Sequence, residues 1–148
     1  MKLNIIIDAD IEETTISIKA PSLNDEVIQI QNFINNFEES KKNYLLGFKD
    51  EETLLLKFNE IIVIYAENKN IFCKTRNGVF KLNKTLKLLE EILPENKFIR
   101  INNGEIVNID YIDHMELNYN SISVSLKNNE VYFVSRRSIK RFKEILGL

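Results

Sequence analysis

Residues 97–143 read KFIRINNGEIVNIDYIDHMELNYNSISVSLKNNEVYFVSRRSIKRFK, and this stretch decides the fold. Apolar and polar residues alternate strictly from Ser121 to Leu126, which predicts a strand with one buried face and one solvated face. Asn103-Gly104 and Asn128-Asn129 have the composition of turns between such strands. The stretch closes on Ser135-Arg136-Arg137-Ser138, which predicts the start of a basic helix. Together these features indicate short antiparallel strands followed by a helix.

The residues before this stretch continue the same pattern. Turns are expected at Asn68-Lys69-Asn70 and at Asn77-Gly78, which is a strong hairpin signal. A short helix is expected to open at Asn83 or Thr85 and to end at Pro94. Two expected strands, Thr53–Phe58 and Ile61–Tyr65, should pair with each other around Asn59-Glu60. Strands are expected at Thr53–Phe58, Ile61–Tyr65, Ile71–Thr75, Val79–Leu82, Phe98–Ile101, Ile106–Val107, Ile112–Leu117 and Val131–Val134.

The N-terminal third predicts a different unit. Apolar residues alternate with polar ones at Leu3–Ile7 and Ile16–Ile18, which indicates two half-buried strands. Ser22 or Asn24 is then expected to cap a helix whose apolar residues lie at helical spacing from Val27 to Phe37. Asn43–Glu52 has a glycine and several charges and is expected to be a connector. The predicted organisation is therefore a β-β-α unit over residues 1–46 and a mainly β domain with short helices, an α+β fold, over residues 47–148.

The composition argues against several classes of function. Of 148 residues, only four are glycine and one is cysteine, so neither a glycine-rich phosphate loop nor a zinc cluster is expected. His114 stands alone on an expected strand, and Cys73 is expected to be a buried structural thiol. We therefore expect no enzyme and no cofactor. Because no apolar run approaches the roughly 20 residues that span a bilayer and no signal peptide is evident, a cytoplasmic protein is expected.

The formal net charge of −2 conceals an uneven distribution. Residues 1–52 carry 5 basic and 11 acidic side chains, whereas residues 53–148 carry 15 basic and 11 acidic ones. On the last helix, Arg137, Lys140 and Arg141 should lie opposite an apolar stripe of Ile139, Phe142 and Leu146. This pattern is compatible with a nucleic-acid site in the second part of the chain. A solvated basic helix face is the alternative.

One family shares the order of these motifs. Phe98-Ile99-Arg100-Ile101-Asn102-Asn103, then Ile106-Val107-Asn108, then Tyr111-Ile112 resembles the core pattern of LytTR-type DNA-binding domains. Val134-Ser135-Arg136-Arg137 before a helix is similar to the closing segment of that family. The resemblance covers about residues 50–146. It implies a short bacterial transcription regulator without a receiver domain, built as an elongated set of antiparallel sheets that presents loops to successive major grooves.

The resemblance also implies roles for individual residues. Base contacts are expected from Asn103, Arg137 and the first loop, at Lys69 or Asn70, because arginine suits the guanine edge and asparagine the adenine edge. Phosphate contacts are expected from Asn68, Arg100, Asn102, Arg136, Lys140 and Arg141. Arg100 could equally pair with an acid, and Asn108 is expected to fix a turn by bonding the backbone. Gly104, where the family often has serine, is expected to allow a positive φ.

The expected partner is double-stranded promoter DNA, contacted at direct repeats. A homodimer formed through the N-terminal unit and a membrane-protein partner are further expectations from the resemblance. The alternative is a protein-interaction module or anti-regulator that keeps the same fold, and the net charge of −2 favours this alternative slightly.

Overall fold

The computed structural model describes residues 1–148 and divides them into two compact units, residues 1–34 and 35–148. The division falls inside helix α1, Asp25–Ser40. Asn24 begins this helix, because its side-chain Oδ1 accepts a hydrogen bond from the backbone N–H of Val27 at 3.0 Å. The expected helix is thus confirmed, and the expected domain boundary after residue 46 stays a prediction.

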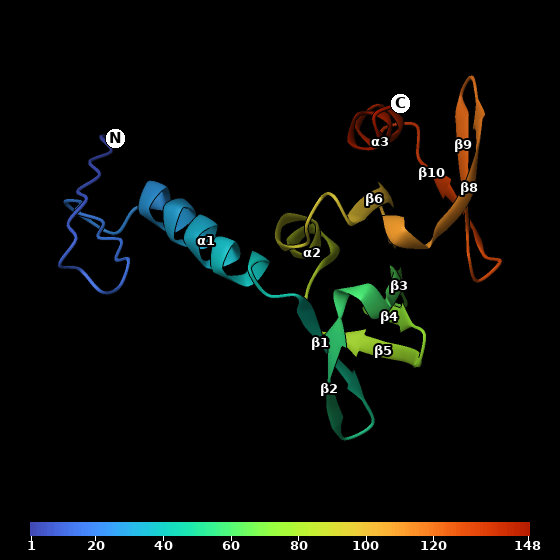
Figure 1. The fold of residues 1–148 in the computed structure, drawn as a ribbon, viewed down its shortest axis with the longest axis horizontal. Helices are drawn as coiled ribbons and strands as arrows, with labels where there is room; N and C mark the ends of the chain where they lie inside the picture. Colours follow the sequence, from blue (N-terminus) through green and yellow to red (C-terminus); the bar gives the residue numbers. More distant parts are fainter. The chain divides into compact units, whose positions relative to one another are not determined.

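Residues 1–24 contain no strand (Figure 1). The strands expected at Leu3–Ile7 and Ile16–Ile18 are wrong, and their apolar side chains are exposed, by 90% for Ile7 and 65% for Ile16. Two strands without a sheet or helix to cover their apolar face are marginal in water. The alternating residues of this segment therefore have no neighbouring strand with which to form a sheet.

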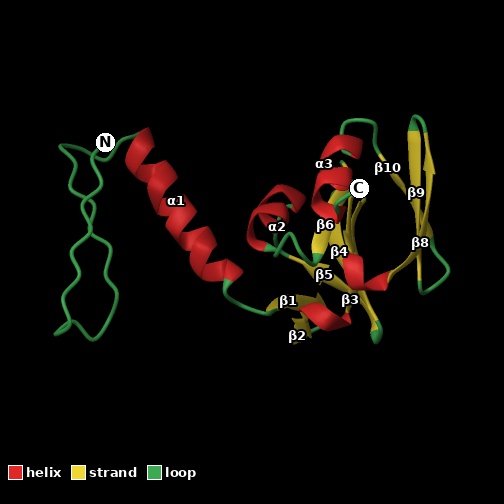
Figure 2. Ribbon diagram, turned by 45° about the horizontal axis from the view of Figure 1, so that its top comes forward, coloured by secondary structure: helices red, strands yellow, loops and turns green.

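The second unit consists of two antiparallel sheets and short helices, as expected from the sequence (Figure 2). The larger sheet has seven strands in the order β2-β1-β5-β4-β3-β7-β6, and the smaller has three in the order β10-β9-β8. The elements are β1 Tyr44–Lys49, β2 Glu52–Lys57, β3 Ile61–Glu67, β4 Asn70–Thr75, β5 Gly78–Leu82, α2 Leu86–Ile92, β6 Phe98–Asn102, β7 Glu105–Asn108, β8 Ile112–Asn118, β9 Ser121–Leu126, β10 Val131–Val134 and α3 Ile139–Leu146.

The first strand of the sheet was not expected. The predicted connector at Asn43–Glu52 is wrong, because β1 occupies it and pairs with β2 along its whole length. The expected pairing of β2 with β3 is also wrong, since a 3₁₀ turn at Phe58–Glu60 separates them. Gly47 marks a close approach between strands. A Cβ there would clash with Leu56 Cδ1 and would lie 2.9 Å from Phe80 Cβ.

Strand β3 is buried on both faces and separates two hydrophobic cores. Ile61 and Ile64 belong to the core under α2, whereas Ile62 and Val63 belong to the core shared with the smaller sheet and α3. A bulge in the β3–β4 pairing between Ile61 and Val63 accounts for this break in alternation. Cys73 is fully buried in the first core, where burial raises the pKa of its thiol to about 12. The prediction of a structural thiol is confirmed.

The two short helices begin in different ways. Thr85 caps α2, its Oγ1 accepting from the N–H of Leu88 at 3.2 Å, as expected. Helix α3 was expected to begin near Ser135 but begins at Ile139. The N–H of Ser135 donates to the carbonyl of Ile101 in β6 at 2.8 Å, and the N–H of Ser138 donates to Ser135 at 2.8 Å. These bonds hold Arg136 and Arg137 in a turn instead of a helix.

Asn108 is the buried polar residue that joins two connections of the second unit. Its Nδ2 donates to the carbonyls of Phe58 at 3.1 Å and Ile61 at 2.7 Å, and its Oδ1 accepts from the N–H of Asp110 at 3.0 Å. The side chain is fully buried. The expectation that it bonds the backbone is confirmed, and it ties the β2–β3 connection to the start of β8.

Replacing Asn108 by alanine should destabilise the second unit. The change leaves buried backbone groups without partners, so we expect the free energy of unfolding in urea to fall by about 2–3 kcal/mol. Asn118→Ala is the matched control, because Asn118 is exposed on β8 and should change stability by less than about 0.5 kcal/mol. Equal losses in the two variants would contradict the role given to Asn108.

Candidate nucleic-acid interface

Three turns of the second unit lie close together: the β3–β4 turn at residues 68–69, the β6–β7 turn at residues 103–104 and the β10–α3 turn at residues 135–138. Strand β3 pairs with β7, with Tyr65 opposite Glu105. The N–H of Ala66 donates to the carbonyl of Gly104 at 2.8 Å, so the end of β3 lies against the β6–β7 turn. The β3–β4 turn follows directly.

Hydrogen bonds also join the β10–α3 turn to the β6–β7 turn. Asn102 Nδ2 donates to the carbonyl of Phe133 at 3.1 Å. Arg137 Nη2 donates to Asn103 Oδ1 at 3.1 Å, across 34 residues of sequence. Both Arg137 and Asn103 are exposed. The structure thus brings together two of the predicted base-contact residues.

Arg100 and Asn102 hold the β6–β7 turn in place. Arg100 Nη1 lies 3.0 Å from Glu90 Oε2, and the same guanidinium donates to the carbonyls of Asn102 at 3.2 Å and Asn103 at 2.9 Å. Asn102 Oδ1 accepts from the N–H of Gly104 at 2.9 Å. Two roles were expected for Arg100, and the structure shows the second one, an ion pair with an acid. The phosphate contacts expected of Arg100 and Asn102 stay predictions.

Gly104 does not have the positive φ that was expected of it. A Cβ at this position would meet only Asn102 Oδ1, at 3.7 Å, which is an ordinary contact distance. The turn is therefore shaped by Arg100 and Asn102, and a serine would fit the same backbone.

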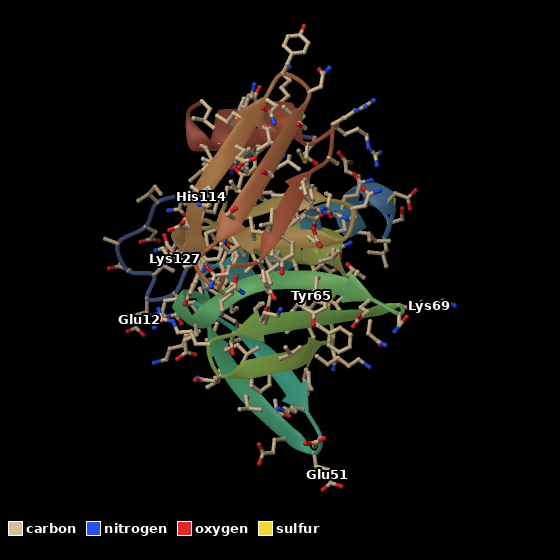
Figure 3. The ribbon with its side chains drawn as sticks, turned by 90° about the vertical axis from the view of Figure 1, so that its right-hand side faces the viewer. Glu12, Glu51, Tyr65, Lys69, His114 and Lys127 are labelled. Atoms are coloured by element: carbon tan, nitrogen blue, oxygen red, sulfur yellow. The ribbon has the colours of Figure 1, made fainter.

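The β3–β4 turn has an uncommon backbone. Asn68 and Lys69 have φ of 49° and 64°, as in a two-residue type I′ hairpin turn. Asparagine tolerates this conformation well, whereas lysine rarely adopts it. Asn70 Nδ2 donates to the carbonyl of Asn68 at 3.2 Å. Figure 3 shows Lys69 at the tip of the hairpin, with its side chain pointing away from the sheet.

The basic side chains at the turns differ in whether a carboxylate lies close enough to neutralise their charge. Lys69, Arg136, Arg137 and Lys140 are exposed and have no carboxylate within 4.0 Å. Arg141, in contrast, forms an ion pair with Glu95. Four uncompensated cations therefore surround the three turns, even though the chain as a whole carries a net charge of −2.

Sequence reasoning missed some of the supporting residues. Glu90 on α2 orients Arg100, and Glu105 on β7 orients Asn102. The sequence spacing of neither glutamate indicated this role.

His114 is exposed on β8, and its Nδ1 lies 2.8 Å from Asp113 Oδ2, which confirms the exposed strand position expected for it. None of the α-helices combines the length and the apolar composition of a membrane span.

Comparisons with known proteins show which family the chain belongs to. Residues 51–147 match the family model of the LytTR DNA-binding domain. A protein of Staphylococcus aureus strain NCTC 8325, named an uncharacterized HTH-type transcriptional regulator, is 39% identical over 149 residues, which cover 100% of this chain and 99% of that protein. A protein of the same name from strain MW2 matches equally well.

A solved structure shows the same fold. It is the LytTr DNA-binding domain of a Bacillus cereus protein, which matches 72% of this chain and 99% of its own length with a TM-score of 0.69 and 21% identity. The family match covers about two thirds of the chain and includes all three turns. The chain therefore belongs to the LytTR DNA-binding domain family.

Proposed function

We propose that the protein is a sequence-specific transcription regulator that inserts its three turns into the major groove at promoter direct repeats. The observation that carries the proposal is the hydrogen bond between Arg137 and Asn103 at 3.1 Å. It holds a guanidinium and a carboxamide, the two groups best suited to read guanine and adenine edges, side by side on exposed turns. Family membership supports binding to double-stranded DNA.

The roles of the turn residues follow from their exposure and contacts. Asn103 and Arg137 would read base edges in one groove, and Lys69 with Asn70 would reach the next. Arg136, Lys140 and Asn68 would contact phosphates, which position the protein without reading sequence. Arg141 would do so only by exchanging its ion pair with Glu95 for a phosphate. Arg100 and Asn102 would act mainly by orienting Asn103, because their polar atoms are already engaged.

A helix-turn-helix is not the reading element in this proposal. The Staphylococcus aureus relatives carry that term in their names. In this chain, however, the five strands β6 to β10 separate α2 from α3, so no two consecutive helices form such a motif. The turns are therefore the elements that would enter the DNA grooves.

Residues 1–46 would join two copies of the chain. Several apolar side chains of this segment have no partner within the chain, among them Ile7, Ile16 and Phe33, which is 73% exposed. A second copy would cover them and would present two DNA-binding units to two repeats. The membrane-protein partner stays an expectation from the resemblance.

Binding to DNA should be detectable and salt-dependent. We expect fluorescence anisotropy with duplexes selected from genomic fragments to report binding. The logarithm of the association constant should fall linearly with the logarithm of salt concentration, with a slope of about 0.9 per phosphate contacted. Absence of binding to any duplex at low salt would contradict the proposal and favour the protein-interaction module.

Arg137→Ala should remove sequence discrimination. We expect the free-energy difference between selected and random duplexes to shrink by about 1–3 kcal/mol, because a bidentate contact to guanine is lost. Arg137→Lys is the matched control for charge and should recover phosphate attraction but not discrimination. If Arg137→Ala weakened both duplexes equally, Arg137 would be a phosphate contact and the assignment would be wrong.

Lys69→Gly should stabilise the protein while weakening its binding to DNA. Glycine adopts the positive φ of 64° without strain, so the free energy of unfolding should rise by about 0.5–1 kcal/mol. Asp50→Gly is the control, because Asp50 has a φ of 53° in the β1–β2 turn and is not among the interface residues. It should gain less stability, because aspartate tolerates this conformation better than lysine, and its DNA affinity should be unchanged. Unchanged affinity in Lys69→Gly would remove Lys69 from the interface.

A further inference from the structure

A basic groove lies beside the β10–α3 turn and outside the residues assigned so far to base contacts. It has a volume of about 530 Å³ and is formed by the β8–β9 turn on one side and by the β10–α3 turn with α3 on the other. Figure 2 shows the end of the β8–β9 hairpin and α3 at the same end of the second unit. The lining residues are Tyr119, Asn120, Arg136, Ile139, Lys140 and Lys143.

Three of the six lining residues are cations without a compensating acid. Arg136, Lys140 and Lys143 have no carboxylate within 4.0 Å. The neighbouring Arg141, on the same helix, is paired with Glu95. Like charges gathered around one groove repel each other, and an anion held between them would remove that repulsion.

The end of α3 adds to this preference for an anion. Arg136 and Lys140 flank the N-terminus of the helix, where the helix dipole is positive. No acidic residue occupies the first turn, and the N-cap residue Ser138 makes no side-chain hydrogen bond to the helix. The usual intramolecular compensation for a helix N-terminus is thus missing on this side of the groove.

The opposite wall presents groups that suit a nucleic-acid strand. Tyr119 is 98% exposed, and Asn120 is also exposed. An exposed phenol offers a hydroxyl donor for a phosphate and a flat face for a sugar or base, and the carboxamide of Asn120 offers two more donors. The groove therefore combines point charges on one wall with neutral donors on the other.

We propose that this groove holds the phosphodiester backbone of the DNA strand next to the site of Arg137, so that the β8–β9 turn is a fourth contact element. Arg136 lines the groove and Arg137 follows it directly in the chain, so the groove is continuous with the base-reading turns. The inference rests on the proposed DNA binding and adds Tyr119, Asn120 and Lys143 to the interface. Its phosphate contacts would strengthen binding to all sequences alike.

The test uses the full chain with Lys140→Gln and Lys143→Gln combined. The double variant should bind selected and random duplexes roughly tenfold more weakly and should lower the salt slope by about 2, with discrimination unchanged. Lys127→Gln is the matched control, since it follows the other end of β9, where its Nζ donates to the carbonyl of Asp110 at 2.8 Å (Figure 3). This control should keep both affinity and slope.

A second measurement places the groove on the DNA. Replacing single phosphates of the selected duplex by neutral methylphosphonates should weaken the wild type at one or two flanking positions. At those positions the double variant and Tyr119→Ala should lose less affinity than the wild type, because their contact is already reduced. Wild-type affinity and slope in the double variant, alongside lost discrimination in Arg137→Ala, would overturn the groove but keep the proposed function. Absence of any wild-type binding would overturn both.

Discussion

The pairing of β3 with β4 on one side and β7 on the other is the constraint on which the rest of the second unit depends. The buried half of β3 contributes Ile61 and Ile64 to one core and Ile62 and Val63 to the other, so a slip by one residue would change which core each side chain enters. The end of β3 then leads into the β3–β4 turn and lies against the β6–β7 turn through the bond from Ala66 to Gly104. The pairing of the strands therefore determines where the turns of the candidate interface lie.

Polar contacts convert this arrangement into a defined surface. Glu90 on α2 orients the guanidinium of Arg100, which donates hydrogen bonds to the carbonyls of Asn102 and Asn103. Arg137, near the C-terminal end of the chain, donates to Asn103 Oδ1. A preorganised site loses less conformational entropy on binding than a flexible one. Lys69, Arg136, Arg137 and Lys140 have no carboxylate within 4.0 Å, which leaves uncompensated cations at the turns. Local charge, rather than the net charge of −2, therefore governs which partner the surface can attract.

Most of the second unit could be predicted from the sequence, because alternation and Asn-Gly turns are local signals. The elements that were mispredicted depend on distant contacts. Gly47 reads as a loop residue until Leu56 and Phe80 are seen to crowd it. The start of α3 is delayed because Ser135 bonds to β6. Residues 1–24 have the alternation of strands but no sheet to join. For the site, the family resemblance implied base contacts by Asn103 and Arg137. The hydrogen bond between these two residues and the contact of Glu90 with Arg100 could be found only from the folded structure.

The most direct test of the central claim is an amide chemical-shift map of the protein titrated with a selected DNA duplex. If the three turns enter the DNA, the largest shifts should fall at residues 68–70, 102–104 and 135–137, with β2 and the β1–β2 turn unchanged. Shifts confined to other surfaces, with these three segments unaffected, would contradict the claim that the turns form the DNA-binding interface.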